Sequence, residues 1–256
     1  MTLRVAACIK RVPITGGRIV LTEDARAIDT RHLGFTMSPH EECGVEEAVR
    51  IIEAGGGDSV VLALGPAEVV EQLRDAMALG IDRAIHLQTD GQEWDGEATA
   101  AALTDALRAD EAAAGRFDII FFGNESADSG GFQVGARVAY ALGRPCVTGL
   151  KRVLIEGSSV RCEQEVEGGR DVYIVPLPAV LTVKEGLNLP RYPSVPGKMR
   201  ARNKAVAVTT PIRPAARLEL VSLAVPAGQG RRAESLGSGA AAAPAVVELL
   251  RKAGVL

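Results

Sequence analysis

The sequence has few aromatic residues and no strong net charge, and each absence excludes a class of function. Phe, Trp and Tyr make up 4% of the 256 residues although 47% of the chain is hydrophobic, so Ala, Val and Leu supply most of the apolar content. This composition favours packed α/β layers over stacking surfaces for bases. Lys and Arg total 29 against 32 Asp and Glu, a net charge of −3, so we expect no nucleic-acid partner.

Long hydrophobic runs and paired cysteines are also missing. No apolar run approaches the roughly 18 to 20 residues that span a bilayer, and residues 1–9 lead straight into Lys10 without a signal-peptide cleavage site. We therefore expect no membrane insertion and a cytoplasmic location. The 4 cysteines are scattered and the 3 histidines do not cluster with them, which argues against a disulfide framework or a zinc site.

Familiar catalytic motifs are absent as well. The chain contains no G-x-S-x-G, G-x-x-x-x-G-K-[ST], H-E-x-x-H or G-x-G-x-x-G sequence. The stretch 128–131 is superficially similar to the Ser-Gly-Gly loop of ATP pyrophosphatases, but it follows the fourth predicted strand rather than the first. No set of residues predicts a catalytic triad.

Short β-branched runs alternate with helical periods over the first half of the chain. This alternation predicts an α/β fold with a doubly wound, mainly parallel sheet and crossover helices. Residues 10–37 predict a hairpin-like excursion, and 151–175 predict an antiparallel meander added to the sheet. The main strands are expected at 3–9, 59–64, 84–87, 117–122 and 179–183.

The segment 38–41 predicts how the first helix begins. Ser38 suits the N-cap, Pro39 the first helical position and Glu41 the third, which together form a capping box. In that arrangement both polar side chains bond the backbone at the start of their own helix.

The second half divides near residue 204. Residues 186–204 predict a long structured loop, and 205–239 keep little helical period and end in glycine-rich stretches, including 228–230, so we expect an extended arm. Helical spacing returns over 240–256. We predict a domain over 1–204, and an arm with a terminal helix over 205–256 that docks on its own domain or on a partner.

Three loops at the carboxyl ends of parallel strands form the candidate site: 8–11, 63–66 and 123–134. In an open α/β sheet these ends meet where the strand order switches, and a crevice for a small ligand forms there. Glycines in the third loop allow close approach, and the helix that follows offers N–H groups to a phosphate. An ordinary strand-to-helix turn remains the alternative interpretation.

Several segments, in order along nearly the whole chain, carry a family resemblance. They are Ile9–Pro13, Ser38-Pro39, Val45–Arg50, Gly65–Ala67, Ala78–Ala84, Gly123–Gly135, Leu177–Val180 and Asn188–Tyr192. Together they resemble the beta subunit of electron transfer flavoprotein, with V-E-E-A-V-R and Asn-x-Pro-Arg-Tyr the most specific pair. The arm is similar only in character.

The resemblance implies an adenine-nucleotide-hydrolase-like, Rossmannoid fold and an electron-carrier subunit rather than an enzyme. It implies a heterodimer with an alpha subunit, on which the arm docks and with which the chain shares FAD. Electrons would come from flavin dehydrogenases, such as the acyl-CoA dehydrogenases of fatty acid oxidation, and pass toward a quinone oxidoreductase.

The resemblance also implies a structural AMP in this subunit, whose binding would add free energy to folding. The implied contacts are Cys8, Ser38, Pro39, His40, Glu41, Leu64, Gly123, Asn124, Glu125, Ser126, Asp128, Ser129, Gly130, Gly131, Phe132, Gln133 and Val134. Two alternatives stay open: a second FAD in place of AMP, because residues 133–135 also resemble electron-bifurcating relatives, and an adenine-nucleotide-binding module unrelated to electron transfer. Glu41 departs from the family pattern, and its charge would repel a phosphate unless it faces backbone.

Residues 186–197 correspond to the family's recognition loop, which anchors dehydrogenases. The implied partner contacts are Arg191, Tyr192, Val195 and Pro196, with Val195 in place of the usual leucine. Flanking prolines would lower the ordering entropy of such an anchor. A loop packed on its own domain is the alternative.

Overall fold

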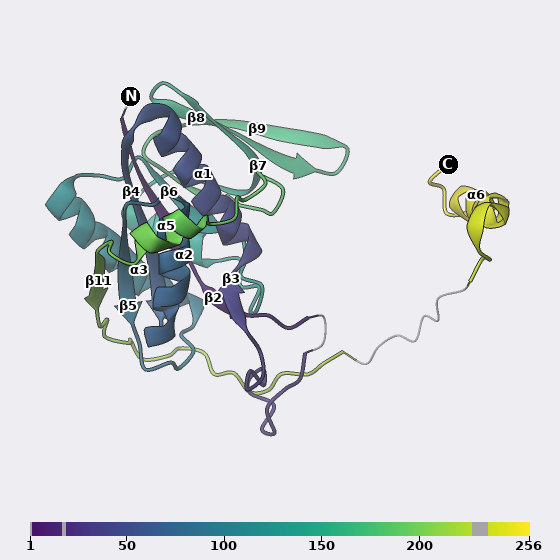
Figure 1. The fold of residues 1–256 in the computed structure, drawn as a ribbon, viewed down its shortest axis with the longest axis horizontal. Coiled ribbons are helices and arrows are strands. Elements are labelled where there is room, and N and C mark those ends of the chain that lie inside the picture. Colours follow the sequence, from purple (N-terminus) through teal and green to yellow (C-terminus); the bar gives the residue numbers. More distant parts are fainter. Residues whose placement is uncertain (1, 17–18, 227–234) are drawn as a thin grey trace.

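One mainly parallel sheet of nine strands organises the computed structural model, which describes residues 2–16, 19–226 and 235–256 (Figure 1). The strand order is β11-β5-β4-β1-β6-β10-β7-β8-β9, which confirms the predicted doubly wound α/β class. The strands are β1 (Leu3–Ile9), β4 (Gly57–Gly65), β5 (Arg83–Gln88), β6 (Ile119–Gly123), β7 (Cys146–Glu156), β8 (Ser159–Val166), β9 (Gly169–Pro176), β10 (Ala179–Val183) and β11 (Val206–Thr209).

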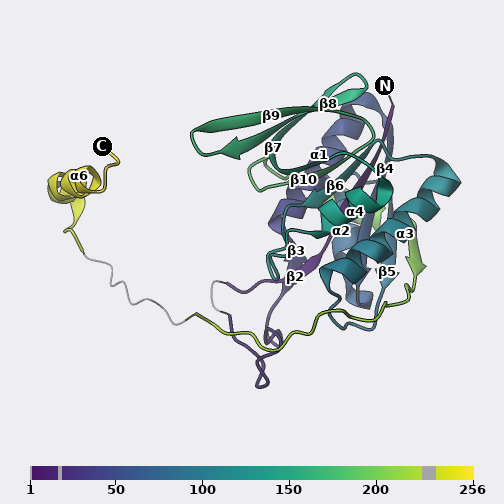
Figure 2. The ribbon, with the colours of Figure 1, turned by 180° about the vertical axis from the view of Figure 1, so that it is seen from behind.

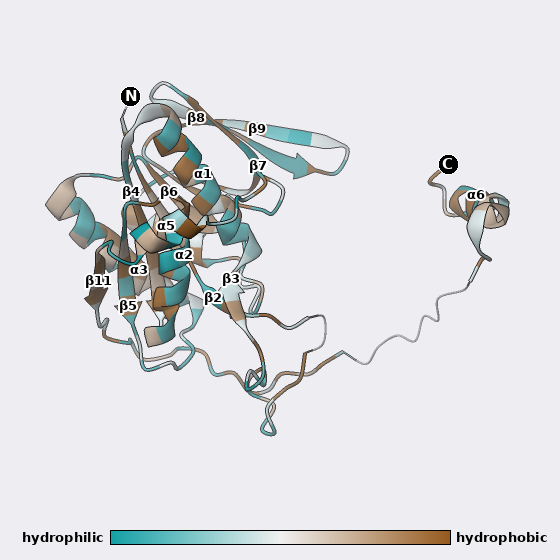
Figure 3. Ribbon diagram, in the orientation of Figure 1, coloured by the Kyte–Doolittle hydropathy of each residue, from teal (hydrophilic) through white to brown (hydrophobic). Residues whose placement is uncertain are grey.

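Helices cover both faces of this sheet, so its central strands are apolar on both sides. One face carries α1 (Pro39–Gly55), α2 (Val70–Leu79) and α5 (Val195–Ala201), and the other carries α3 (Gly96–Ala114) and α4 (Val134–Leu142) (Figures 1 and 2). A 3-10 turn, η1 (Ala67–Val69), precedes α2. Brown and teal alternate around α1 and α2 in Figure 3, as expected for helices with one buried face. In the described ranges, no helix has both the length and the apolar character that crossing a bilayer requires.

The strand order switches between β1 and β6. From β1 the chain crosses through α1 to β4 and through α2 to β5, and it returns through α3 to β6 on the other side of β1. Cys8 pairs in parallel with Leu62 of β4 and with Phe122 of β6. The loops after β1 and β6 therefore start side by side and leave toward opposite faces.

Two antiparallel additions appear where the sequence predicts them. Strands β2 (Arg11–Pro13) and β3 (Phe35–Met37) pair before α1, and β7, β8 and β9 form the meander at one edge of the sheet. Gly157 and Gly168 occupy the two meander turns with φ of 63° and 79°, a conformation that favours glycine.

The stretch 186–204 contains a helix that the sequence analysis assigned to a loop. Helix α5 begins where the Ser194 side chain accepts a hydrogen bond from the Gly197 N–H at 3.1 Å, and it packs on α2 so closely that a Cβ on Gly197 would lie 2.5 Å from Ala78 O. Tertiary packing, rather than apolar periodicity, places this helix.

Beyond α5 the chain adds one more strand before it becomes an arm. Strand β11 pairs in parallel with β5, so the sheet extends to Thr209. Arg213 then donates to Gln92 Oε1 at 2.9 Å and to Glu93 O at 2.6 Å, which holds the arm beside the loop after β5. Residues 227–234 of the predicted arm lie outside the described residues. The turn η2 (Gly239–Ala242) and helix α6 (Ala243–Lys252) lie apart from the sheet in Figures 1 and 2.

An ion network joins the amino ends of three strands. Arg4 of β1 bonds Asp58 of β4 at 3.0 Å and also Asp110 of α3, and Arg83 of β5 bonds Asp110 at 2.6 Å. Burial alone would raise the pKa of Asp110, but hydrogen bonds from Arg83 and Arg4 lower it below its usual value. The network fixes the amino ends of these strands, at the end of the sheet opposite the candidate site.

We predict that Asp110→Asn lowers the free energy of unfolding by about 2 to 3 kcal/mol at pH 7, because Arg4 and Arg83 lose their shared carboxylate. Because the pKa of Asp110 is lower in the folded protein than in the unfolded chain, the ionised carboxylate stabilises the fold at pH values above its unfolded pKa. This contribution is lost as the pH falls through the folded pKa. The difference from the wild type should therefore shrink below about pH 4. Urea unfolding of both proteins at pH 7 and below about pH 4 measures the difference in the free energy of unfolding. The exposed Asp105→Asn on the same helix should change stability by less than about 0.5 kcal/mol; equal effects of the two variants would contradict the prediction.

Candidate functional site

Lys10 joins three strand-end loops near the switch point, namely those that follow β1, β5 and β6. Its Nζ lies 2.7 Å from Asp128 Oδ2 in the loop after β6 and 2.8 Å from Glu93 Oε1 in the loop after β5. Burial alone would lower the pKa of Lys10, but the two carboxylates outweigh it and raise that pKa. Lys10 is absent from the predicted contacts, although its place directly after a buried strand was a usable signal.

The side chains of Ser38 and Glu41 hold neighbouring loops rather than their own helix. Helix α1 begins at Pro39 as expected, but Ser38 Oγ accepts the N–H of Ala127 at 3.1 Å and the Glu41 carboxyl accepts the N–H of Lys10. The predicted capping box is therefore wrong in its hydrogen bonds. The physical reason is that the N–H groups of Lys10 and Ala127 lie beyond the paired residues of β1 and β6 and need other acceptors.

Burial favours the protonated form of Glu41. The residue is 8% exposed, and burial raises the pKa of its carboxyl to about 8. The charge that would repel a phosphate is therefore disfavoured at pH 7. Burial, and after it Glu41, also raises the pKa of the Cys8 thiol, so Cys8 forms an uncharged wall of the crevice.

Gly123 lets the capping segment and the loop after β6 meet. A Cβ at this position would lie 2.7 Å from Glu41 Cγ, 3.2 Å from His40 Cβ and 3.2 Å from Glu125 O. Any side chain would push these groups apart. The structure therefore brings together four of the predicted contacts, and it requires glycine at the point where they touch.

The rest of this loop folds on itself. The Ser126 and Ser129 hydroxyls lie 2.8 Å apart, and the Gly130 N–H donates to Ser126 O at 3.0 Å. Phe132 has φ of 54°, a left-handed conformation that is unusual for a residue other than glycine. Such outliers occur preferentially at functional sites. The tight turn sets the direction in which α4 starts.

Asn124 and Gln133 have partners within the protein. Asn124 Oδ1 accepts from Thr182 Oγ1 at 2.9 Å, which joins the loop to β10, and Gln133 Oε1 accepts from Arg137 Nε at 2.8 Å. Their side-chain oxygens are therefore less available to a ligand than their sequence positions imply.

Several polar groups near the loops have no partner in the described part of the chain. Asp128 Oδ1 is buried and receives no hydrogen bond from the described residues. Helix α4 begins at Val134 without a side-chain cap from those residues, so its first N–H groups have no side-chain acceptor among them. Apolar walls flank this region, because Cys8 is buried and Leu64 packs against the same hydrophobic cluster. These groups lie at or just beyond the carboxyl ends of β1, β4 and β6, where the strand order predicts a crevice.

An open hollow of about 470 Å³ adjoins this crevice. Its lining residues are His40, Glu125, Lys151, Lys184, Glu185 and Gly186. Only the first two are predicted contacts. Lys184 directly follows the buried strand β10, so the strand-end argument would have found it had β10 been counted among the site strands. Burial lowers the pKa of His40, so its ring is mainly neutral at pH 7.

The predicted partner contacts lie on a different surface. Tyr192 is 96% exposed and Val195 is 74% exposed, and Pro196 beside it is also exposed. Arg191 instead faces α1, where it pairs with Glu46 and Glu53. Helix α1 contacts both regions, because its Glu46 pairs with Arg191 and the residues at its amino end bond the loops of the site.

We predict that Glu41→Gln changes how stability depends on pH. A folded pKa of about 8, against a usual 4.5, means that the protonated side chain stabilises the fold fully below pH 4.5 and loses this contribution as the pH rises through 8. Gln does not titrate, so the variant should gain a few kcal/mol relative to the wild type between pH 5 and pH 8. Urea unfolding across this range checks the trend. The exposed Glu71→Gln is the control, and a constant difference for Glu41→Gln would rule the explanation out.

Comparison with known proteins identifies the family of this chain. The family model described as the electron transfer flavoprotein domain matches residues 26–213. A protein of Syntrophomonas wolfei called electron transfer flavoprotein subunit beta is 34% identical over 227 residues, which cover 88% of this chain and 87% of that protein. The Mycobacterium bovis protein of the same name is 36% identical over 80% of this chain and 78% of its own length, and the mitochondrial one of Arabidopsis thaliana is 33% identical over 81% and 82%. The chain therefore belongs to the electron transfer flavoprotein family, as one of its beta subunits.

Proposed function

We propose that this chain is the electron-carrier beta subunit of a heterodimer, and that it binds AMP in the crevice at the switch point. The observation that supports AMP best is the group of unmet polar atoms there. Asp128 Oδ1 is a buried acceptor, and the start of α4 supplies N–H donors. A nucleoside phosphate offers the matching groups, because a ribose hydroxyl donates and a phosphate accepts.

The two ends of AMP would contact different loops. The adenine would lie against the apolar wall of Cys8 and Leu64, and the phosphate would face the loop 130–133 and the first turn of α4. Protonated Glu41 would add no negative charge to this site at pH 7. AMP has no reaction to undergo here; its binding would stabilise loops that otherwise leave buried groups unpaired.

FAD would be shared with the alpha subunit. The open hollow beside the crevice offers the Lys151 and Lys184 ammonium groups to an anionic cofactor, and its open side leaves room for a second chain to complete the site. When bound, FAD supplies the one- and two-electron chemistry that carrier proteins use. The residues of this chain would orient the cofactor and set the charge around it.

The arm and α6 would dock on the alpha subunit. The arm exposes apolar side chains at Ile212, Leu218 and Val221, and α6 is a helix of 10 residues whose side chains are exposed or half-buried. So short a helix is marginal in water unless its apolar side packs on something. A partner subunit would supply that packing.

Flavin dehydrogenases would dock on the exposed loop that carries Val195. Electrons from these donors, acyl-CoA dehydrogenases among them, would reach the FAD and then pass to a quinone oxidoreductase. We expect the complex to work in the cytoplasm.

A second candidate function keeps the fold and changes the cofactor. Residues 133–135, Gln-Val-Gly, resemble bifurcating relatives, in which a second FAD replaces AMP. Denaturing the purified heterodimer and identifying the released nucleotides separates the two. We expect one AMP and one FAD per heterodimer; two FAD would favour the bifurcating type. A colourless homodimer that binds ATP would overturn both and favour an unrelated nucleotide-binding module.

We predict that Val195→Asp slows electron acceptance from an acyl-CoA dehydrogenase about 10-fold or more. Burying one Val side chain contributes roughly 1.5 kcal/mol or more, and a carboxylate in its place would have to be desolvated. The heterodimer and its flavin spectrum should stay unchanged, because Val195 is distant from the crevice. Stopped-flow reduction of the flavin measures the rate. Tyr140→Asp, at an exposed position of α4, is the control, and an unchanged rate for Val195→Asp would argue against the docking role.

A further inference from the structure

One surface segment combines exposed apolar side chains with a fixed backbone. This anchor loop, defined here as residues 187–199, exposes Leu189 (85%), Tyr192 (96%) and Val195 (74%). Exposed large apolar side chains gathered in one segment are typical of interaction sites. A mobile loop would pay an entropy cost each time it docked. The hydrogen bonds of this loop show how that cost is reduced.

A buried carboxylate of α1 holds the loop through Arg191. Glu46 is 1% exposed, and its Oε2 lies 2.9 Å from Arg191 Nε. The far side of the same guanidinium meets Glu53, with Nη1 at 2.7 Å and Nη2 at 2.9 Å from its two oxygens. The Arg191 N–H also points to Glu46 Oε2 at 3.3 Å. One guanidinium therefore spans two carboxylates that lie two helical turns apart on the same face of α1.

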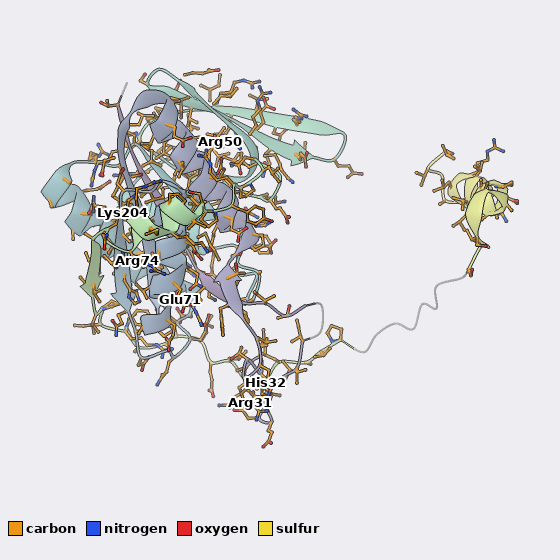
Figure 4. The ribbon with its side chains drawn as sticks, viewed as in Figure 1. Arg31, His32, Arg50, Glu71, Arg74 and Lys204 are labelled. Atoms are coloured by element: carbon orange, nitrogen blue, oxygen red, sulfur yellow. The ribbon has the colours of Figure 1, made fainter. Side chains whose placement is uncertain are left out.

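Neighbouring residues extend this hold. Arg50 donates to Glu46 Oε1 at 2.6 Å and to Leu189 O at 3.3 Å, and Figure 4 labels it on α1. Asn188 Nδ2 donates to Cys43 O at 3.0 Å and to Glu47 Oε2 at 2.9 Å. The backbone of 188–191 is thus held along α1.

The other end of the loop is held by α2. Helix α5 packs on α2 at Gly197, and Lys204, just beyond α5, donates to Met77 O at 3.2 Å and to Ile81 O at 2.5 Å. Arg74 of α2 donates to Lys204 O at 2.7 Å, and the two residues lie close together in Figure 4. The apolar side chains therefore project from a segment that is fixed at both ends.

The pair joins a buried carboxylate, Glu46, to a guanidinium whose side chain is 38% exposed. Desolvation of the Glu46 charge offsets part of the attraction, so the pair is a poor device for stability alone. Burial alone would raise the pKa of Glu46, but hydrogen bonds from Arg191 and Arg50 keep it below its usual value and the carboxyl stays charged. The pair also fixes the orientation of Arg191 relative to α1, because a planar guanidinium bonds carboxylates in a fixed fork geometry.

We propose that the pairing of Arg191 with Glu46 and Glu53, the Arg191 clamp, positions the anchor loop for docking, so that Arg191 acts through the loop and does not itself touch the partner. This differs from the sequence-based expectation, in which Arg191 is a partner contact. The inference rests on the docking role proposed above for Val195. Arg191 is then a positioning residue.

Arg191→Lys in the intact heterodimer tests the clamp. Lys keeps the positive charge, but one ammonium group cannot form the fork between two carboxylates. We expect amide hydrogen exchange over 187–199 to become about 10-fold faster. The KM for an acyl-CoA dehydrogenase reduced by its acyl-CoA substrate should rise about 5-fold, with kcat and the flavin spectrum unchanged, because docking and not chemistry is weakened. Arg108→Lys is the matched control: its side chain donates to Ala141 O on the opposite face of the sheet.

A second variant keeps the test decisive if Arg191→Lys folds poorly. Glu53→Gln removes only the outer, exposed half of the clamp, and we expect about a 2-fold rise in KM with the fold intact. The double variant Glu53→Gln with Arg191→Lys should be no worse than Arg191→Lys alone, since both act on one clamp.

Four results would overturn the proposal. Unchanged loop exchange in Arg191→Lys would show that the clamp does not order the loop. A fall in kcat with constant KM would place Arg191 in the electron-transfer step. If Val195→Asp raises KM and Arg191→Lys does not, the clamp is irrelevant to docking while the docking role of Val195 stands. If Val195→Asp itself has no effect, the docking role fails, and the inference fails with it even where loop exchange is faster.

Discussion

The parallel pairing of β1 with both β4 and β6 is the constraint on which the site depends. It aligns Cys8 with Leu62 on one side and with Phe122 on the other, so the loops that follow must start from neighbouring points and leave toward opposite faces. Their backbone N–H groups then lie beyond the last strand bonds and need other acceptors. Ser38 and Glu41 satisfy two of these groups. The crevice therefore follows from strand order, and the polar side chains around it first serve the protein's own backbone.

Local signals in the sequence predicted the elements well, and distant contacts account for what they could not predict. The strand 3–9 and the start of α1 at Pro39 depend on apolar runs and on a Ser-Pro start, which are properties of a few adjacent residues. The same signals placed the two antiparallel additions. The partners of Ser38 and Glu41 depend on loops 89 and 31 residues away, so a capping box was the best local expectation and was wrong. Helix α5 was missed for the same reason, because the apolar spacing of its own residues does not predict its packing on α2.

Helix α1 performs two positioning tasks along one element. Its amino end holds the loops of the crevice, and its middle, through Glu46 and Glu47, holds residues 188–191 of the anchor loop. Val45 and Val49 of the same stretch face the sheet and are buried. This explains why V-E-E-A-V-R and Asn-x-Pro-Arg-Tyr stand out together in the sequence: the valines fit the helix to the sheet, and the acidic residues receive the loop. A shift of α1 would therefore move both surfaces at once.

The buried titratable groups of the crevice fit a carrier subunit better than a catalyst. A nucleophile or general base needs a pKa brought toward working pH together with a neighbour that takes the proton. Burial raises the pKa of the Cys8 thiol, which makes the reactive thiolate rarer. Glu41 has a pKa near 8, yet its carboxyl is occupied by the Lys10 N–H and is enclosed by Gly123 and its neighbours. In the proposed AMP site, the raised pKa of Glu41 would remove charge beside the anion, which serves binding rather than proton transfer.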